Sequence, residues 1–400
     1  LFRSGEVGND QIGGDRFLYL PSSYGAASDS GVNKYNFGLA SNPYTSLMIV
    51  ENKIGNPDLT WEKAKKMNVG VDINLFNNCL TASFDIFKEK RNNILANRST
   101  SPMIIGANLP AYNFGEMENR GWEMDLNFRH HIQDFHYWAR FNYSFARNEI
   151  IYMDEVQKRY DYQMTTGRRK NQFFGLIFDG YYNSWEEINA LDRPKSSWSG
   201  NQLQPGDVKY VDVNRDGVID DYDMVPIGYT PVPEIIYGFS FGAQYKGFDF
   251  SILFQGADNV SIKYFGRSMW PFAKGEESAK SLIKERWTQE RYEAGEKITF
   301  PRLSLNPNGE TDHNYRPSTL WIRDASYLRL KNLEVGYTFT GGFVKRLNLN
   351  SVRLYFNGSN LFTWTDVVDL DPEAPSRSGN VEINTYPLQK VYNIGLNINF

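Results

Sequence analysis

The sequence lacks long apolar runs. None of its 400 residues lie in an uninterrupted apolar stretch close to eighteen residues, and the mean hydropathy is negative. Transmembrane helices are therefore excluded, because a helix that crosses a bilayer needs about 20 mostly apolar residues. A β-barrel of the outer-membrane type is not excluded, since its strands alternate apolar and polar residues and so dilute the hydropathy.

Cysteine, histidine and net positive charge are also scarce. The single cysteine, Cys79, has no second cysteine with which to form an internal disulfide, and we interpret it as a small residue at the beginning of a strand. The net charge of −4 argues against nucleic acid as a main partner. The four histidines show no metal-ligand spacing, and no GxSxG motif occurs. We therefore expect no catalytic residues and no enzyme activity.

The sequence begins at Leu1 without an initiator methionine, a positively charged leader or an apolar signal stretch. We interpret it as a processed product or a fragment of a longer polypeptide. The fragment is favoured because the first five residues resemble the end of a strand.

Aromatic residues and alternating patterns are abundant. Tyr and Phe number 25 and 27, as expected where rings lie at membrane interfaces. Apolar and polar residues alternate with period two in nine runs, which predicts nine strands. The runs occupy residues 69–75, 80–86, 122–128, 137–145, 237–245, 248–254, 320–339, 352–356 and 392–400.

The polar faces of these runs carry charged groups that a protein core would not tolerate without partners. They include Asp72, Glu123, Asp125, Arg129 and Arg140. A hydrated lumen accommodates such groups at little cost, so the pattern favours a transmembrane antiparallel β-barrel over a soluble sandwich. The alternation slips between Leu330 and Leu333, which predicts a bulge.

The spacing of the runs predicts one barrel portion over residues 1–400, with nine strands plus a stub. Long loops at about 6–58, 91–114, 149–234, 259–318 and 366–386 are expected to be extracellular, and the short turns at 77–78, 132–135 and 246–247 periplasmic. We expect short strands at 16–20 and 47–50 and a short helix at 278–292. Nine strands do not close a bacterial barrel, so further strands are expected from another part of the polypeptide.

Seven stretches, distributed along nearly the whole chain, resemble one known family, the SusC/RagA group of TonB-linked outer-membrane transporters. They are VGNDQIGGDRFLYL (7–20), GNPDLTWEK (55–63), GDVKYVDVNRDGVIDDYD (206–223), GFSFGAQYKGFDFSILFQG (238–256), IRDASYLRLKNLEVGYTF (322–339), NGSNLFTWT (357–365) and YPLQKVYNIGLNINF (386–400).

The resemblance implies a 22-stranded barrel filled by an N-terminal plug and energised by TonB. It also implies a SusD-like surface lipoprotein that acts as a hinged lid, and import of oligosaccharides or peptides across the outer membrane of a Bacteroidetes-type Gram-negative cell. Outer-membrane lipid and lipopolysaccharide would surround the wall. The sequence contains no plug and no TonB-binding segment, so both are expected N-terminal to Leu1.

One loop has the ligand spacing of an EF-hand, with oxygen donors at positions 1, 3, 5, 7, 9 and 12 and a glycine, Gly217, at position 6. The donors are Asp212, Asn214, Asp216, the backbone carbonyl of Val218, Asp220 and Asp223. This pattern predicts a divalent cation, Ca²⁺ by its all-oxygen ligands, that stiffens an extracellular loop. The alternative is an acidic turn without metal.

Three loop tryptophans, Trp185, Trp198 and Trp270, are candidates for stacking on a sugar or packing against a lid. Anchoring of the loops themselves is the competing interpretation.

The sequence as a whole favours the C-terminal barrel part of a SusC-like importer. One alternative is a SusC-like structural or assembly subunit of a larger outer-membrane complex. Another is a secreted calcium-binding carbohydrate-active enzyme or adhesin, although modules of that kind duplicate the acidic loop and this sequence contains it once.

Overall fold

The computed structural model describes most of the chain, and all structural statements below refer to these residues. They are 2–7, 23–26, 34–38, 44–47, 49–53, 55–100, 109–198, 203–264, 270–272, 281–304, 312–373, 380–381 and 387–400. The strand expected at 16–20 lies outside them.

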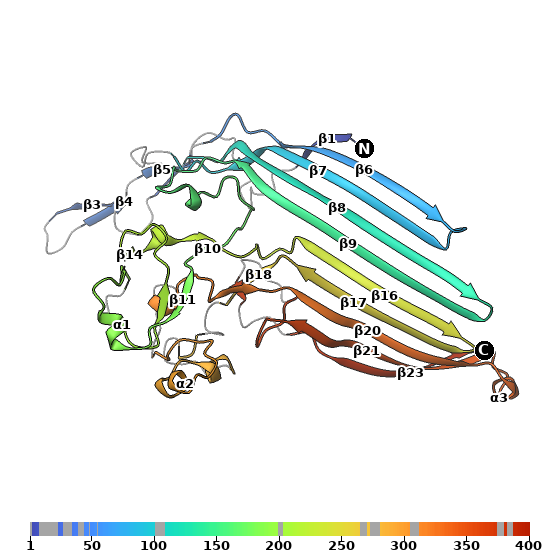
Figure 1. The fold of residues 1–400 in the computed structure, drawn as a ribbon. Coiled ribbons are helices and arrows are strands. Elements are labelled where there is room, and N and C mark those ends of the chain that lie inside the picture. Colours follow the sequence, from blue (N-terminus) through green and yellow to red (C-terminus); the bar gives the residue numbers. More distant parts are fainter. Residues whose placement is uncertain are drawn as a thin grey trace.

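Ten strands form one antiparallel sheet in the order β1-β6-β7-β8-β9-β16-β17-β20-β21-β23 (Figure 1). Their bounds are β1 Phe2–Val7, β6 Glu62–Leu75, β7 Leu80–Ala96, β8 Tyr112–Ile132, β9 Phe135–Tyr152, β16 Ile235–Tyr245, β17 Phe248–Asp258, β20 Tyr327–Phe339, β21 Ser351–Thr365 and β23 Val391–Asn399. Each of the nine alternating runs falls within one of these strands or overlaps it, and the all-β antiparallel class predicted from the sequence is confirmed.

The two ends of the sheet differ (Figure 1). Short connections join the strands at the end where the C-terminus lies, and the long excursions gather at the opposite end. The turn between β6 and β7 uses Phe76, Asn77 and Asn78, all with positive φ, and the turn between β16 and β17 uses Lys246 and Gly247. A short helix that the sequence pattern did not predict, α3 (Gly342–Arg346), lies in the β20–β21 connection.

The apolar side chains of the alternating runs share one face of the sheet, and many of them are exposed. Val69 is 59% exposed, Val335 43% and Ile394 81%. Register places apolar residues opposite one another, as in the row that joins Ile86, Trp122 and Phe145. Exposure of these rows excludes their burial between two stacked sheets.

The predicted slip in β20 is a bulge. The register with β17 shifts between Leu253 and Phe254, and the register with β21 shifts between Leu330 and Asn332. Lys331 is the extra residue, so the apolar side chains of Leu330 and Leu333 stay on the same face.

The long excursions contain short paired strands. These are β2 (Ser23–Ala26) with β5 (Ile49–Lys53), β3 (Lys34–Phe37) with β4 (Tyr44–Leu47), β10 (Phe174–Gly175) with β15 (Val225–Pro226), β11 (Phe178–Tyr181) with β13 (Val208–Tyr210), β12 (Lys195–Ser196) with β14 (Val218–Ile219), and β18 (Ser261–Tyr264) with β19 (Ile322–Asp324) and β22 (Asn380–Val381). The strand expected at 47–50 overlaps the ends of β4 and β5.

The helices are short. They are α1 (Trp185–Asn189), α2 (Gln289–Glu293) and α3, with 3₁₀ turns at Asp161–Gln163, Asp221–Asp223, Ser281–Glu285 and His313–Tyr315. The helix expected at 278–292 is thus a 3₁₀ turn followed by the first residues of α2, and residues 278–280 lie outside the described part. No helix among the described residues has the length and apolarity needed to cross a bilayer.

The excursions after β9 and β17 pack together around a common apolar core, here called the loop core. Its most buried members are Leu176, Val208, Tyr264, Phe300 and Trp321, each at most 1% exposed. The sequence suggested loops at these positions, whereas the structure shows an ordered layer above the sheet. Such a layer can hold side chains in fixed positions over the end of the sheet.

Candidate functional site: the polar face and the loop layer above it

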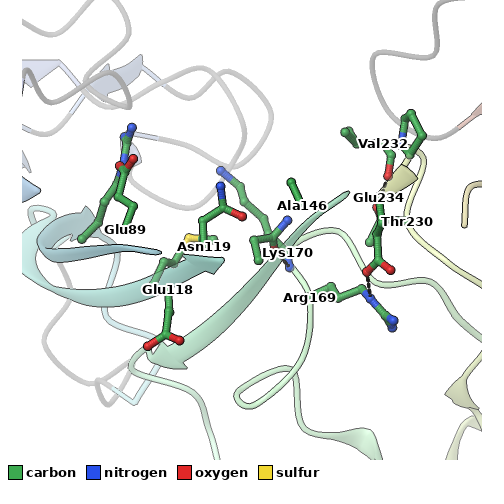
Figure 2. Close-up of a pocket in the computed structure, with 13 residues that line it drawn as sticks. Glu89, Glu118, Asn119, Ala146, Arg169, Lys170, Thr230, Val232 and Glu234 are labelled. Carbon is green, nitrogen blue, oxygen red and sulfur yellow. Dashed lines mark hydrogen bonds and ion pairs between the residues drawn. The ribbon is translucent and has the colours of Figure 1, made fainter. Parts of the chain in front are cut away.

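A cavity of about 360 Å³ lies where the polar face of the sheet meets the loop layer (Figure 2). Its walls come from β7, β8 and β9, from the segment after β9 and from the segment before β16. The lining residues are Glu89, Arg91, Met117, Glu118, Asn119, Ala146, Asn148, Arg169, Lys170, Thr230, Val232, Pro233 and Glu234. In Figure 2 the side chain of Glu118 points away from that of Asn119, as expected for consecutive strand residues.

The floor of this cavity is a row of cross-strand neighbours, Glu89, Asn119 and Asn148. Glu89 pairs with Lys66 at 3.0 Å and with Arg91 at 2.6 Å. The Asn148 side-chain oxygen accepts a hydrogen bond of 2.7 Å from the backbone N–H of Lys170, which ties the loop layer to the sheet. The cavity therefore presents amides and charges of both signs.

Glu234 closes one side of the cavity and is 5% exposed. Its carboxylate binds the Arg147 guanidinium at 2.7 Å and also that of Arg169, the latter contact being visible in Figure 2. Burial opposes ionisation, but the hydrogen bonds from the two guanidinium groups outweigh it and lower the pKa of Glu234. This carboxylate is held in place by its partners and serves as a structural anchor.

A second ionic group crosses the polar face nearer the short turns. Arg353 of β21 binds Asp249 of β17 at 3.0 Å through Nε and Glu334 of β20 at 2.6 Å. The Asp249–Arg353 contact spans β20, where Gly336 lies between the two strands and has no side chain to obstruct it. These partners fit a hydrated face, where partly exposed ion pairs cost little.

A third group attaches the excursion before β23 to the same face. Arg329 of β20 binds Asp371 at 2.6 Å and also Glu373, and Lys331 binds Glu373 at 3.0 Å. Arg329 is only 2% exposed. Burial works against the charge on Asp371, but the bonds to Arg329 prevail and lower its pKa. The segment up to Glu373 is therefore fixed to the polar face by charge.

The predicted metal loop, residues 212–223, contains the short strand β14, which pairs with β12. The Asp212 carboxylate accepts hydrogen bonds from the backbone N–H groups of Arg215 (2.7 Å) and Gly217 (2.8 Å). Gly217 has a φ of +83°, and a Cβ there would have no atom within 4 Å. The sharp turn expected at this glycine is present.

The last residue of that loop, Asp223, is fully buried. Its two carboxylate oxygens accept from the N–H groups of Val213 (2.8 Å) and Asp220 (2.9 Å). Burial raises its pKa despite these bonds. Among the described residues, no three His, Cys, Asp or Glu side chains are gathered as a metal cluster. The donor types suit Ca²⁺, and the cation stays a prediction.

The three candidate tryptophans lie apart. Trp270 is 6% exposed and belongs to the loop core, with its ring 5.3 Å from that of Tyr315. Trp198 packs against the loop core, and the Arg316 guanidinium lies 4.1 Å from its ring centre. Trp185, at the start of α1, is 51% exposed and is the most exposed of the three.

His313 is a structural residue that the sequence pattern did not single out. Its Nε2 lies 2.8 Å from the backbone oxygen of Val208 and its Nδ1 lies 3.0 Å from the Ser196 hydroxyl. Burial lowers its pKa. The neighbouring Asn314 bonds Asp207 at 2.8 Å. The other three histidines, His130, His131 and His136, are at the short turn after β8, and Cys79 lies 3.5 Å from the His130 ring.

Exposed apolar rows on one face, charged and amide groups on the other, and long excursions at one end define the wall of a transmembrane β-barrel. The sequence from residue 20 to residue 361 matches the family model of the TonB-dependent receptor-like β-barrel, and the chain belongs to this family. It is an outer-membrane β-barrel protein, and the TonB-linked family predicted from the sequence motifs is confirmed.

Similar proteins agree with this assignment. TonB-dependent receptor P26 of Formosa agariphila is 27% identical over an alignment of 412 positions that covers 96% of this chain and 40% of that protein. TonB-dependent receptor SusC of Bacteroides thetaiotaomicron is 26% identical over an alignment of 402 positions that covers 99% of this chain and 37% of SusC. The chain thus spans about two fifths of the length of these relatives.

The fold agrees with a solved structure. The RagAB peptide importer in its open-open state superposes with a TM-score of 0.70 at 22% identity, and the match covers 100% of this chain and 40% of that one. The barrel class predicted from the alternating runs is therefore confirmed, and the exposed apolar face is the lipid-facing side of the wall. The polar face lines the lumen.

Proposed function

We propose that the chain forms the C-terminal wall and outer loops of a SusC-like, TonB-dependent importer of oligosaccharides or peptides. The observation that carries this proposal is the lumen cavity floored by Glu89, Asn119 and Asn148, beneath an ordered loop layer. A lumen wall that offers amides and charges of both signs suits a polar solute too large for a passive pore.

The long excursions supply a docking platform for a SusD-like lipoprotein lid. Support comes from their common apolar core and from the ionic attachment of the last excursion through Arg329, which give the outer surface a fixed shape. Trp185, exposed at the start of α1, is the tryptophan placed to contact a solute or a lid. TonB acts through the part of the protein that precedes this wall.

The wall performs no chemistry on the solute in this proposal. The family consists of receptors and transporters, and two buried carboxylates, Glu234 at the cavity and Asp371 beside β20, are committed to ion pairs. Glu234 and Asp371 each bind arginine and have lowered pKa values. Neither is suited to act as a proton donor near neutral pH.

Uptake by the complete protein in an outer membrane with functional TonB tests the import proposal. Labelled oligosaccharide and peptide pools should accumulate inside, and accumulation should stop when TonB is removed. Co-purification adds a second test, since an importer should bring one lipoprotein lid. Absence of uptake together with a wider set of barrels and accessory proteins would support the structural or assembly role instead.

We further propose that the loop 212–223 binds Ca²⁺ and stiffens the outer surface. The EF-hand spacing and the turn at Gly217 support this. In the full-length protein, Ca²⁺ should slow proteolysis of the loop, and Asp212→Asn with Asp216→Asn should abolish that protection. Asp192→Asn, at an exposed position of a nearby loop, is the matched control. Equal proteolysis with and without Ca²⁺ would leave the acidic turn as the correct interpretation.

A further inference from the structure

A row of cations runs along the lipid-facing side of the wall, immediately above the apolar belt. The belt ends in the cross-strand row Val69, Ile86, Trp122 and Phe145. The next outward-facing row comprises Met67, Lys88, Arg120 and Arg147. Three neighbouring strands therefore change from apolar to cationic at the same height.

That height matches the edge of a bilayer. On β8 the outward positions from Ile132 to Trp122 span ten residue steps. At roughly 3.3 Å per residue and a tilt of about 40°, they cover roughly 25 Å, the thickness of the apolar band of such barrels. Arg120 is the next outward residue. With the long loops outside the cell and the short turns in the periplasm, Arg120 lies among the outer-leaflet headgroups.

Arg120 has a cation directly opposite it on both neighbouring strands, Lys88 on β7 and Arg147 on β9. Like charges in directly opposed positions destabilise a sheet unless a counter-charge lies between them. Arg147 is bound to Glu234 and Lys88 to Glu118 at 2.9 Å, whereas the carboxylate nearest Arg120, that of Glu149, is 3.8 Å away. The Arg120–Glu149 ion pair is thus the longest and most exposed of the three, so the Arg120 guanidinium keeps N–H donors for a further anion.

A polar cavity of about 400 Å³ adjoins this row, where Asn148 and the loop residues 167–169 meet Arg120 and Arg147. Its lining includes Arg120, Arg147, Arg168 and Arg169, with Glu149 as the one carboxylate. Guanidinium groups bind phosphate oxygens through paired N–H donors. The patch is local, because on β17 the outward-facing residue in the cross-strand row of Phe145 and Ile235 is a carboxylate, Asp258.

We infer that this cavity and the cationic row bind the phosphate group of an outer-leaflet glycolipid, with Arg120, Lys88 and Arg168 as the residues that contact it. The acyl chains of the same lipid would lie against Trp122 and Phe145 directly below. The inference depends on the membrane orientation and does not depend on which solute is imported.

Native mass spectrometry of the full-length protein in detergent tests the inference, with diphosphorylated lipid A as the probe and dephosphorylated lipid A and inorganic phosphate as comparisons. Diphosphorylated lipid A should bind, and Lys88→Gln with Arg120→Gln should weaken it roughly tenfold or more, since each cation near an anionic headgroup contributes severalfold. Lys66→Gln is the matched control, because Lys66 lies on the lumen face and pairs with Glu89.

Arg168→Gln provides a second test. Because Arg168 lies outside the barrel strands, this substitution should not affect barrel assembly. It should also weaken lipid binding, with heat-modifiable gel migration unchanged. The inference is overturned by equal binding of the phosphorylated and dephosphorylated lipids, by retention of binding in both variants, or by inorganic phosphate that competes at equal concentration, which would indicate a soluble anion as the ligand.

Discussion

Arg329 and Asp371 form an ion pair of 2.6 Å although the Arg329 side chain is 3% exposed and that of Asp371 7%. The pair joins a barrel strand to the excursion before β23, 42 residues further along the chain. Removal of one partner from a buried pair leaves the other charge without compensation, and this loss commonly costs about 3–5 kcal/mol.

Arg329→Met should therefore release the segment 366–373 from the lumen face while the sheet stays assembled. Hydrogen exchange of that segment in the full-length protein should rise by at least tenfold, and protease should cleave there first. Arg346→Met, at the end of α3, is the control and should change neither. Unchanged exchange in Arg329→Met would show that other contacts hold this loop.

Acid should loosen the loop core through His313. Burial lowers the pKa of His313 below the ordinary value of 6.5. Below pH 6.5 the imidazole is protonated in the unfolded segment but stays neutral in the folded one. The free energy of unfolding is therefore constant above about pH 6.5 and decreases below it, by at most about 1.4 kcal/mol per pH unit. The carboxylates of Asp207 and Asp312 act in the opposite direction to burial, and Arg316 acts with it.

Exchange rates of the segment 313–322 at pH 7.5 and 5.5, corrected for intrinsic exchange, measure this effect. The His313→Gln variant should be less stable at pH 7.5 but should lose the acid dependence. His131→Gln, at an exposed turn, should keep it. A pH response that persists in His313→Gln would assign the titration to another group.

Gly121 of β8 should be sensitive to any side chain. A Cβ there would lie 2.0 Å from the Phe145 backbone oxygen and 2.6 Å from the Phe87 ring. The backbone oxygen of Phe145 cannot move far enough to relieve this overlap. Gly121→Ala should therefore reduce the fraction of assembled, heat-modifiable barrel. Gly341→Ala, where a Cβ meets no atom within 4 Å, is the control. Full assembly of Gly121→Ala would show that β8 and β9 can separate locally.

Charge on the two faces of β9 should have opposite consequences. Phe141→Arg places a cation in the lipid near the middle of the wall and should cost about 2–4 kcal/mol in a refolding titration. Asn142→Arg, one residue further, points into the lumen opposite Asp125 and should cost less than about 1 kcal/mol. Equal costs at the two positions would contradict the assignment of the faces.

The sheet was predictable from sequence because a long strand between lipid and water has a strict period. Val69, Val71 and Ile73 face one side, and Gly70 and Asp72 the other, so the alternation is visible without any neighbour. The slip at Leu330 was visible for the same reason, since one extra residue reverses the order of faces.

The loop layer was not predictable in the same way. Its strands are as short as two residues, for example β12 and β14, and show no period. Their stability comes from contacts far apart in sequence, such as His313 with Val208 and Arg329 with Asp371. Trp270 illustrates the limit, because the sequence alone does not distinguish a buried anchor from an exposed binding residue. The cationic row on β7, β8 and β9 could not be predicted either, because it depends on the pairing register between strands, which the pattern of one strand does not give.

The alternation of environment along β9 tests the account most directly. With Cys79→Ser as background, single cysteines at positions 137–145 of the full-length protein can be spin-labelled and their accessibility to oxygen and to a water-soluble nickel complex measured in lipid vesicles. Odd positions, including 141 and 143, should favour oxygen, and even positions, including 140 and 142, should favour nickel. Equal accessibility at odd and even positions, or the reverse order, would contradict a wall with lipid on one side and a hydrated lumen on the other.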